Sequence, residues 1–188
     1  MKTPTQTNGS EISAPQKTKP TLYLSCKLYG ASLDNLRAIK RVVELLEETG
    51  RVIVLPIAYD FDRFEPLGNP AEAWDNAAFK VQHADLMVTL LMGDTADERG
   101  MEIMMRMSLP SAKRRKTLVV YDLCVRHSPF YDCMAGNYGM TVKGIVFDRR
   151  RMPEDIMLAI EEWLLLVEES GSDWQRTTLV SQGVAVPV

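Results

Sequence analysis

Short apolar runs alternate along the chain with segments of helical periodicity, and this alternation constrains the fold more than any other feature. The apolar runs occupy 21–25, 52–55, 84–92, 116–121 and 144–147. The helical segments occupy 32–49, 71–83, 100–109 and a stretch from Pro153 to about 169. Runs that are apolar throughout are typical of strands in a parallel sheet covered on both faces by helices. We therefore predict an α/β fold with a single doubly wound, flavodoxin- or Rossmann-like, five-stranded and mainly parallel sheet.

The two ends of the chain differ in composition from this central region. Residues 1–20 are rich in Thr, Pro, Lys and Gln, and they carry too few large apolar side chains to offset the entropy of ordering. From Ser172 onward the sequence lacks helical periodicity. We therefore predict a flexible N-terminal tail over 1–20, a folded α/β domain over 21–170 and a C-terminal tail over 171–188.

Charge and composition exclude several classes of function. The chain has 22 basic and 25 acidic side chains, a net charge of −3, so no basic excess marks a surface for a nucleic-acid polymer. No apolar run approaches the roughly 18–20 residues of a membrane span, and no signal-peptide region opens the chain, so we expect a cytoplasmic protein. The three cysteines and two histidines form no close metal-binding pair. Dinucleotide and phosphate-loop signatures are absent as well, and we expect neither a metal nor a cofactor.

Ligands of such sheets bind beyond the carboxyl ends of the strands, which directs attention to the loops there. One of these, after the third apolar run, carries four carboxylates between Asp94 and Glu102. If a helix begins near Gly100, Glu102 lies in its first turn, where the helix dipole favours an ionised nucleophile or base. Gly100 would let the backbone approach a ligand closely. A solvated acidic turn with helix-capping carboxylates is the alternative interpretation.

The segment Ala84-Asp85-Leu86-Met87-Val88, followed by Asp97 and then Gly100-Met101-Glu102-Ile103, resembles the nucleoside 2-deoxyribosyltransferase family. In that family an apolar strand opening with Ala-Asp precedes a loop with an acid, a glycine and the nucleophilic glutamate of the next helix. Tyr23 and Tyr29 also match the paired aromatic positions around the sugar and base. The resemblance covers roughly 21–148.

This resemblance implies a double displacement on a deoxynucleoside, with a free nucleobase as the second substrate. Glu102 would attack C1′ and expel the base, and a second base would then attack the same carbon with net retention. The resemblance assigns Asp97 as the general acid and Asp75 as a second contact to the base. Tyr23 would orient the carboxylate of Glu102, and Tyr29 would stack on the base. From the residues alone, a half-buried strand tyrosine and a surface aromatic remain the alternatives for these two.

The resemblance also implies a homo-oligomer with sites shared between subunits. In the family, an Asn or Asp of a neighbouring subunit contacts the sugar 5′-hydroxyl. Within the predicted loop 122–139, Asp132 is the closest match and Asn137 the second candidate. The C-terminal tail can likewise reach a neighbour in the family. A loop that merely covers the edge of the sheet is the alternative for 122–139.

Two other functions stay open at this point. A hydrolase would pass the same intermediate to water and would act on nucleoside monophosphates, with Ser25 and Lys27 as the loop candidates near the phosphate. A non-catalytic nucleotide-binding module is the other. It is favoured by two departures from the family, since Ala96 and Ala77 occupy positions where the family usually has acids.

Overall fold

The computed structural model describes residues 18–92, 96–124, 129–147 and 150–181. Its elements, in chain order, are β1 (Thr21–Cys26), α1 (Leu33–Thr49), β2 (Ile53–Val54), β3 (Tyr59–Asp60), β4 (Glu65–Pro66), α2 (Pro70–His83), β5 (Leu86–Leu91), α3 (Ala96–Met107), α4 (Ser111–Arg114), β6 (Thr117–Asp122), α5 (Pro129–Tyr138), β7 (Thr141–Ile145) and α6 (Met152–Ser181). Most of the predicted N-terminal tail, 1–17, lies outside these residues. Within the described part of the chain, no helix has the length and apolar character needed to cross a membrane.

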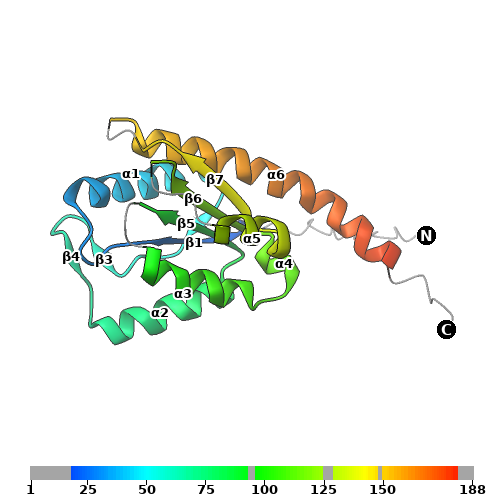
Figure 1. Cartoon of the computed structure of the whole chain (residues 1–188), viewed down its shortest axis with the longest axis horizontal. Coiled ribbons are helices and arrows are strands. Elements are labelled where there is room, and N and C mark those ends of the chain that lie inside the picture. The colour runs from blue at the N-terminus through cyan, green and yellow to red at the C-terminus, as the bar shows by residue number, and fades with distance from the viewer. Residues whose placement is uncertain (1–17, 93–95, 125–128, 148–149, 182–188) are drawn as a thin grey trace, which may run out of the picture.

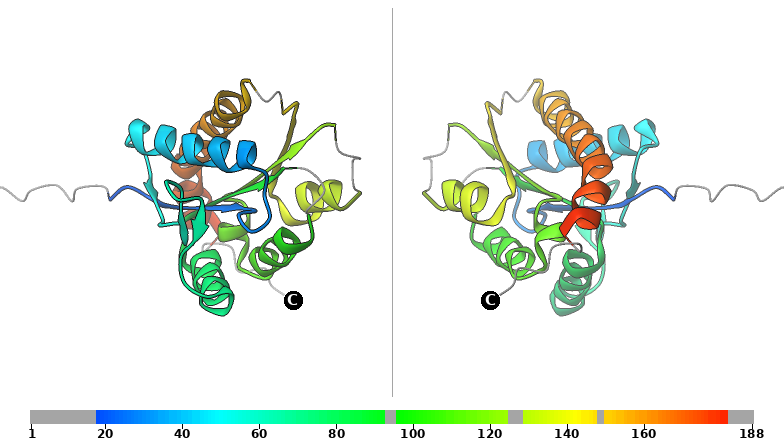
Figure 2. Two further views of the ribbon diagram at one scale, coloured as in Figure 1. Left: turned by 90° about the vertical axis from the view of Figure 1, so that its left-hand side faces the viewer. Right: turned by 90° about the vertical axis from the view of Figure 1, so that its right-hand side faces the viewer.

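Five parallel strands form the main sheet in the order β2-β1-β5-β6-β7. Helices α1 and α6 cover one face of this sheet, and α2, α3 and α5 cover the other (Figures 1 and 2). The predicted doubly wound, flavodoxin-like α/β fold is thereby confirmed. In this strand order the direction of winding reverses between β1 and β5, which is where such folds form a ligand crevice.

Alternate residues of each strand face opposite sides of the sheet, and the two sets pack into different cores. Leu22 and Leu24 of β1 belong to the core under α1 and α6, which also contains the fully buried Trp163. Tyr23, between them, packs with Met87 against α2 on the opposite face. Tyr23 therefore points toward the side of the sheet that α2 and α3 cover.

Helix α1 begins and ends as the sequence indicates. The side chain of Ser32 accepts a hydrogen bond from the Asn35 amide and so caps the first turn. Gly50 adopts a left-handed conformation with φ of 60°, and its amide donates to the Glu47 carbonyl. These caps fix the length of the helix and place the chain for β2.

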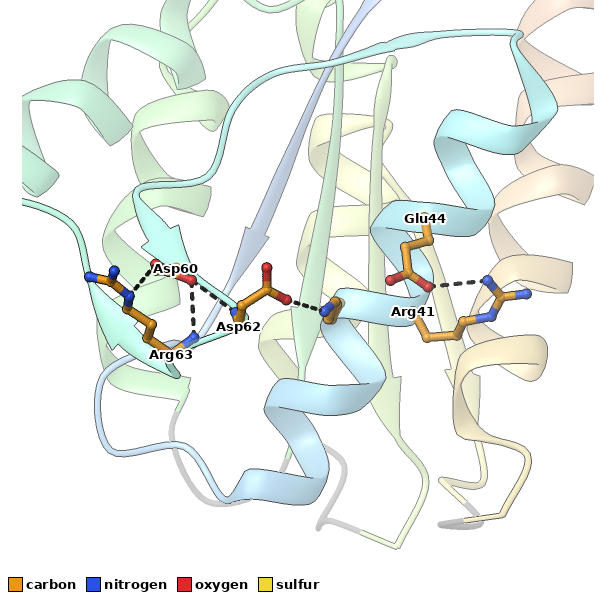
Figure 3. Close-up of polar contacts among 6 residues, drawn as sticks. Arg41, Glu44, Asp60, Asp62 and Arg63 are labelled. Atoms are coloured by element: carbon orange, nitrogen blue, oxygen red, sulfur yellow. Dashed lines mark hydrogen bonds and ion pairs between the residues drawn. The ribbon is translucent and has the colours of Figure 1, made fainter.

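A small antiparallel pair, β3 with β4, lies inside the segment 57–70 that the sequence predicts as a loop. The turn between them is closed by Asp60, whose carboxylate accepts from the amides of Asp62 and Arg63 (Figure 3). Asp62 in turn accepts a hydrogen bond of 2.6 Å from Lys40 of α1. Helix α1 is thus tied to the hairpin that follows Ile57 and Ala58.

Several boundaries differ from the predictions. Helix α5 occupies most of the predicted loop 122–139, with Pro129 in its first turn and Met134 fully buried as its anchor. The last strand is Thr141–Ile145 rather than 144–147. Helix α6 continues to Ser181, across the predicted domain boundary at 170. Extending a formed helix costs far less than nucleating one, so α6 continues beyond its periodic segment.

Candidate functional site

A pocket of about 470 Å³ opens at the carboxyl end of β1, where the winding of the sheet reverses. This volume is within the range of roughly 300–1,000 Å³ that is typical of small-molecule sites. The wall comes from β1 and the loop after it, the segment after β2, and helices α2 and α3. The lining residues are Tyr23, Leu24, Cys26, Leu28, Tyr29, Ile57, Ala58, Ala73, Trp74, Ala77, Lys80, Met101 and Glu102.

Glu102 and Tyr23 meet in the wall of this pocket. The Tyr23 hydroxyl donates a hydrogen bond of 3.1 Å to Oε2 of Glu102, although 79 residues separate the two in the chain. Glu102 is 3% exposed and Tyr23 is 8% exposed. A buried carboxylate needs polar partners to remain in place, and a phenol supplies one without adding charge. The two residues that the resemblance pairs are therefore in direct contact.

The prediction that Glu102 lies in the first turn of its helix is wrong. Helix α3 begins at Ala96, six residues before Glu102, rather than near Gly100. Glu102 thus lies in the second turn, and the effect of the helix dipole falls off within the first. The N-terminal residues Ala96-Asp97-Glu98 suit a first turn, which is why the helix extends this way. Burial and the Tyr23 hydroxyl, rather than the dipole, set the environment of this carboxylate.

Arg106 fixes the helix that carries Glu102, and sequence reasoning missed it. The side chain is completely buried one turn after Glu102, and burial lowers the pKa of Arg106 to about 10. Its guanidinium donates to the hydroxyl of Thr117 and to backbone carbonyls at the end of α2 and the start of β5. The acceptors are Thr117 Oγ1 at 3.1 Å, Val81 O at 2.8 Å, Ala84 O at 3.1 Å and Asp85 O at 3.2 Å. The one available signal was an arginine three residues after Ile103, on the buried side of α3.

The pocket has an aromatic wall that suits a planar ring. Tyr29 lines it as predicted, and its hydroxyl oxygen is buried with no hydrogen-bond partner among the described residues. Trp74 of α2 also lines the pocket, at 37% exposure, and the sequence analysis did not select it. Aromatic faces bind flat rings by stacking, so Tyr29 and Trp74 are pocket-lining side chains suited to a planar ligand.

Asp75 does not reach the pocket. It is exposed on α2 and is absent from the lining residues. The side of α2 that faces the pocket instead carries Ala73, Ala77 and Lys80, at the spacing of one helix face. Gly100 is likewise inside α3 and outside the lining, and a Cβ built on it would meet nothing within 4 Å.

The remaining predicted site residues lie elsewhere. The backbone of Asp97 is in α3 and that of Asp132 is in α5, but their side chains lie outside the described part of the structure. Asn137 is exposed on α5, where its amide donates to Cys133 Sγ at 3.5 Å. Ser25, a candidate phosphate contact, is fully buried in β1 and does not line the pocket.

Asp85, part of the segment that carries the resemblance, lies at the opposite end of the strands from Glu102. Its carboxylate accepts from the Thr21 amide at 2.9 Å and from the Thr21 hydroxyl at 2.8 Å, and the Asp85 amide donates back to that hydroxyl at 3.1 Å. Burial acts to raise the pKa of Asp85, but the Thr21 hydrogen bonds and the charges of Lys113 and Lys116 together outweigh it, so the pKa is lowered. Asp85 therefore joins the amino ends of β1 and β5.

Among the described residues, no group of three or more His, Cys, Asp or Glu side chains is arranged to hold a metal ion. In comparisons with known proteins, no protein-family model and no curated protein sequence matches this chain.

Proposed function

We propose that the protein is a nucleoside 2-deoxyribosyltransferase that exchanges the base of a 2′-deoxyribonucleoside by double displacement on Glu102. One observation carries the proposal. A buried carboxylate, held by a phenol, forms part of the wall of an aromatic-lined pocket at the switch point of a doubly wound sheet. The resemblance to the family leads to the same two residues, Glu102 and Tyr23.

In the first half-reaction a carboxylate oxygen of Glu102 bonds to C1′ as the N-glycosidic bond breaks. The negative carboxylate stabilises the oxocarbenium-like transition state before it forms the ester. The bonding electrons leave with the base, which takes a proton from a general acid, for which the resemblance proposes Asp97. A second base then attacks C1′, returns a proton to the acid and releases Glu102.

Tyr23 serves to orient the nucleophile in this scheme. Its hydrogen bond to Oε2 holds one rotamer of the carboxylate, and a fixed near-attack geometry contributes to the rate. The same hydroxyl can donate to the carbonyl oxygen of the glycosyl ester. Its contact with the reacting group therefore persists through both half-reactions.

The apolar character of the pocket favours a base over water as the acceptor. Leu28, Ile57 and Met101 line it beside the aromatic residues. A pocket of this kind excludes water from a reactive ester while a flat base occupies it. This observation supports transfer over the hydrolase alternative.

The resemblance also supports a homo-oligomer as the active form. Asp132 and Asn137 belong to α5, on the same face of the sheet as α3. We propose that one of them contacts the sugar in a neighbouring subunit. Mixing Glu102→Gln and Asn137→Ala chains tests this sharing. Activity should return in the mixed oligomer only if one site takes Glu102 from one subunit and Asn137 from its neighbour.

The function is tested by incubating the protein with deoxyinosine or thymidine, with and without adenine, and separating products by liquid chromatography. Transfer predicts a new deoxynucleoside that forms only with the acceptor base. Release of free base at the same rate with or without acceptor would establish the hydrolase instead. If neither nucleosides nor their monophosphates are turned over, the non-catalytic nucleotide-binding module is the function that remains.

Two variants assign the activity to the site. Glu102→Gln should lose roughly a thousandfold or more in kcat, because it removes the nucleophile while keeping the size of the side chain. Glu47→Gln is the matched control, since Glu47 is exposed on α1, across the sheet from the pocket. The control should retain native turnover.

A further inference from the structure

A single basic side chain, Lys80 of α2, is found among the described residues that line the pocket. It is half-buried, and its Nζ donates a hydrogen bond of 2.6 Å to the carbonyl oxygen of Pro56. That bond ties α2 to the segment after β2, next to Ile57 and Ala58, which line the pocket as well. A lysine ammonium has three donors, so two remain for other acceptors.

The charge of Lys80 has no carboxylate beside it in the described part of the chain. Burial lowers the pKa of Lys80, and no acidic group counteracts this shift. Lys40, by contrast, has Asp62 at 2.6 Å, and the Asp62 hydrogen bond raises the pKa of Lys40. A half-buried ammonium with free donors gains from any acceptor oxygen that a ligand brings.

The neighbours of Lys80 leave room for such an oxygen. Ala73 and Ala77 precede it on the same face of α2, and their methyl groups are the smallest side chains that a helix presents. Trp74 lies on the same helix at the rim of the pocket. A ring stacked on Trp74 or Tyr29 would share the pocket with Lys80.

We propose that Lys80 is a substrate-binding residue that selects ligands by an acceptor oxygen of full or partial negative charge. The oxygen belongs either to the keto group of a base or to a phosphate of a nucleotide. This inference rests on the proposed function only in taking nucleosides and nucleotides as the ligand class. The resemblance assigned Asp75, a hydrogen-bond acceptor, to contact the base. Helix α2 instead offers the pocket Lys80, which is a hydrogen-bond donor.

Selectivity should follow from that donor. A site built to hydrogen-bond one group of a ligand discriminates strongly against an analogue that lacks it. Keto bases such as hypoxanthine and thymine present an acceptor oxygen, whereas adenine presents an amino group at the equivalent position. A phosphate would instead be recognised whatever the base.

Calorimetric binding of four ligands separates these sources. Deoxyinosine, deoxyadenosine and their 5′-monophosphates are titrated into the full-length protein, with a Glu102→Gln background to prevent turnover. Recognition of a keto oxygen predicts that deoxyinosine binds roughly ten- to a hundredfold more tightly than deoxyadenosine. Recognition of phosphate predicts a similar ratio between each monophosphate and its nucleoside.

Lys80→Met should abolish whichever ratio the chain with Lys80 shows, and Lys80→Leu, which also lacks a donor, tests the same point if the methionine variant fails to fold. Lys116→Met is the control, because Lys116 is exposed before β6 and does not line the pocket. Ratios that survive both Lys80 variants would overturn the proposal, as would a native chain that binds none of the four ligands. Binding selectivity without base exchange would refute the proposed reaction alone.

Discussion

Replacing Arg106 with methionine should destabilise the protein by roughly 2–6 kcal/mol, through the backbone carbonyls that lose their partner. The guanidinium is fully buried and donates four hydrogen bonds. Methionine fills a similar length but donates none. A stability loss of this size is a large part of the 5–15 kcal/mol that typical domains have in total.

The magnitude follows from which acceptors keep a second partner. Ala84 O also accepts from Lys113 at 3.0 Å, and the Thr117 hydroxyl can donate to the Lys113 carbonyl at 3.4 Å. Val81 O and Asp85 O retain no such alternative in the contacts described above. The amide four residues after Val81 is that of Asp85, which bonds to Thr21 instead. Val81 O is buried and Asp85 O is part-buried, and two carbonyls left without a partner at about 1–3 kcal/mol each give the range.

Methionine also removes the cost of burying a charge, which offsets part of the loss from the hydrogen bonds. The assay is urea unfolding at pH 7, followed by circular dichroism, with Arg41→Met as the control. Arg41 is partly exposed on α1 and pairs with Glu44 (Figure 3) and with Glu48. Its loss should leave the unfolding midpoint nearly unchanged. An Arg106→Met chain within about 0.5 kcal/mol of the native protein would refute the reasoning, since it would fall below the cost of one orphaned carbonyl.

Two further substitutions test the contacts that β1 makes with Glu102 and with Asp85. Tyr23→Phe should lower kcat for base exchange by roughly ten- to a hundredfold, because it removes one hydrogen bond to the Glu102 carboxylate. The phenylalanine ring keeps the packing against Met87. An unchanged kcat in steady-state kinetics would contradict the role of Tyr23. Asp85→Asn should lower the unfolding midpoint at pH 7. The folded-state pKa of Asp85 is lowered from 3.8, so its contribution is present above that value and is lost as pH falls through the folded pKa. Unfolding curves of the two chains should therefore converge in acid well below pH 3.8, and a difference that persists there would count against the Thr21 contact.

The sheet could be predicted from the sequence because the buried parallel strands β1, β5 and β6 are mostly apolar. Residues 86–91 and 117–121 admit almost no other interpretation, and the helices between them follow from periodicity and caps such as Ser32 and Gly50. Periodicity and capping residues did not predict where α3 begins. Gly100 resembles a helix boundary, yet four residues before it already belong to the helix.

The site could be predicted only in part. Glu102 was selected from the acidic loop after a buried strand and from the resemblance, and Tyr23 was selected from the resemblance alone. Which side of a helix faces a pocket depends on tertiary packing, and this is why Asp75 was selected on α2 rather than Lys80. Arg106 was missed for the same reason, since its acceptors are backbone carbonyls of other elements, and these leave no mark in the sequence.

Trapping the covalent intermediate tests the central claim most directly. The protein is mixed with deoxyinosine in the absence of an acceptor base, quenched in acid within milliseconds to seconds, and measured by intact mass and peptide mapping. The proposed reaction predicts one deoxyribosyl unit on the peptide that contains Glu102, and no adduct in Glu102→Gln. Base exchange at the native rate by the Glu102→Gln chain, or an adduct that maps to another residue, would contradict the claim that Glu102 is the nucleophile.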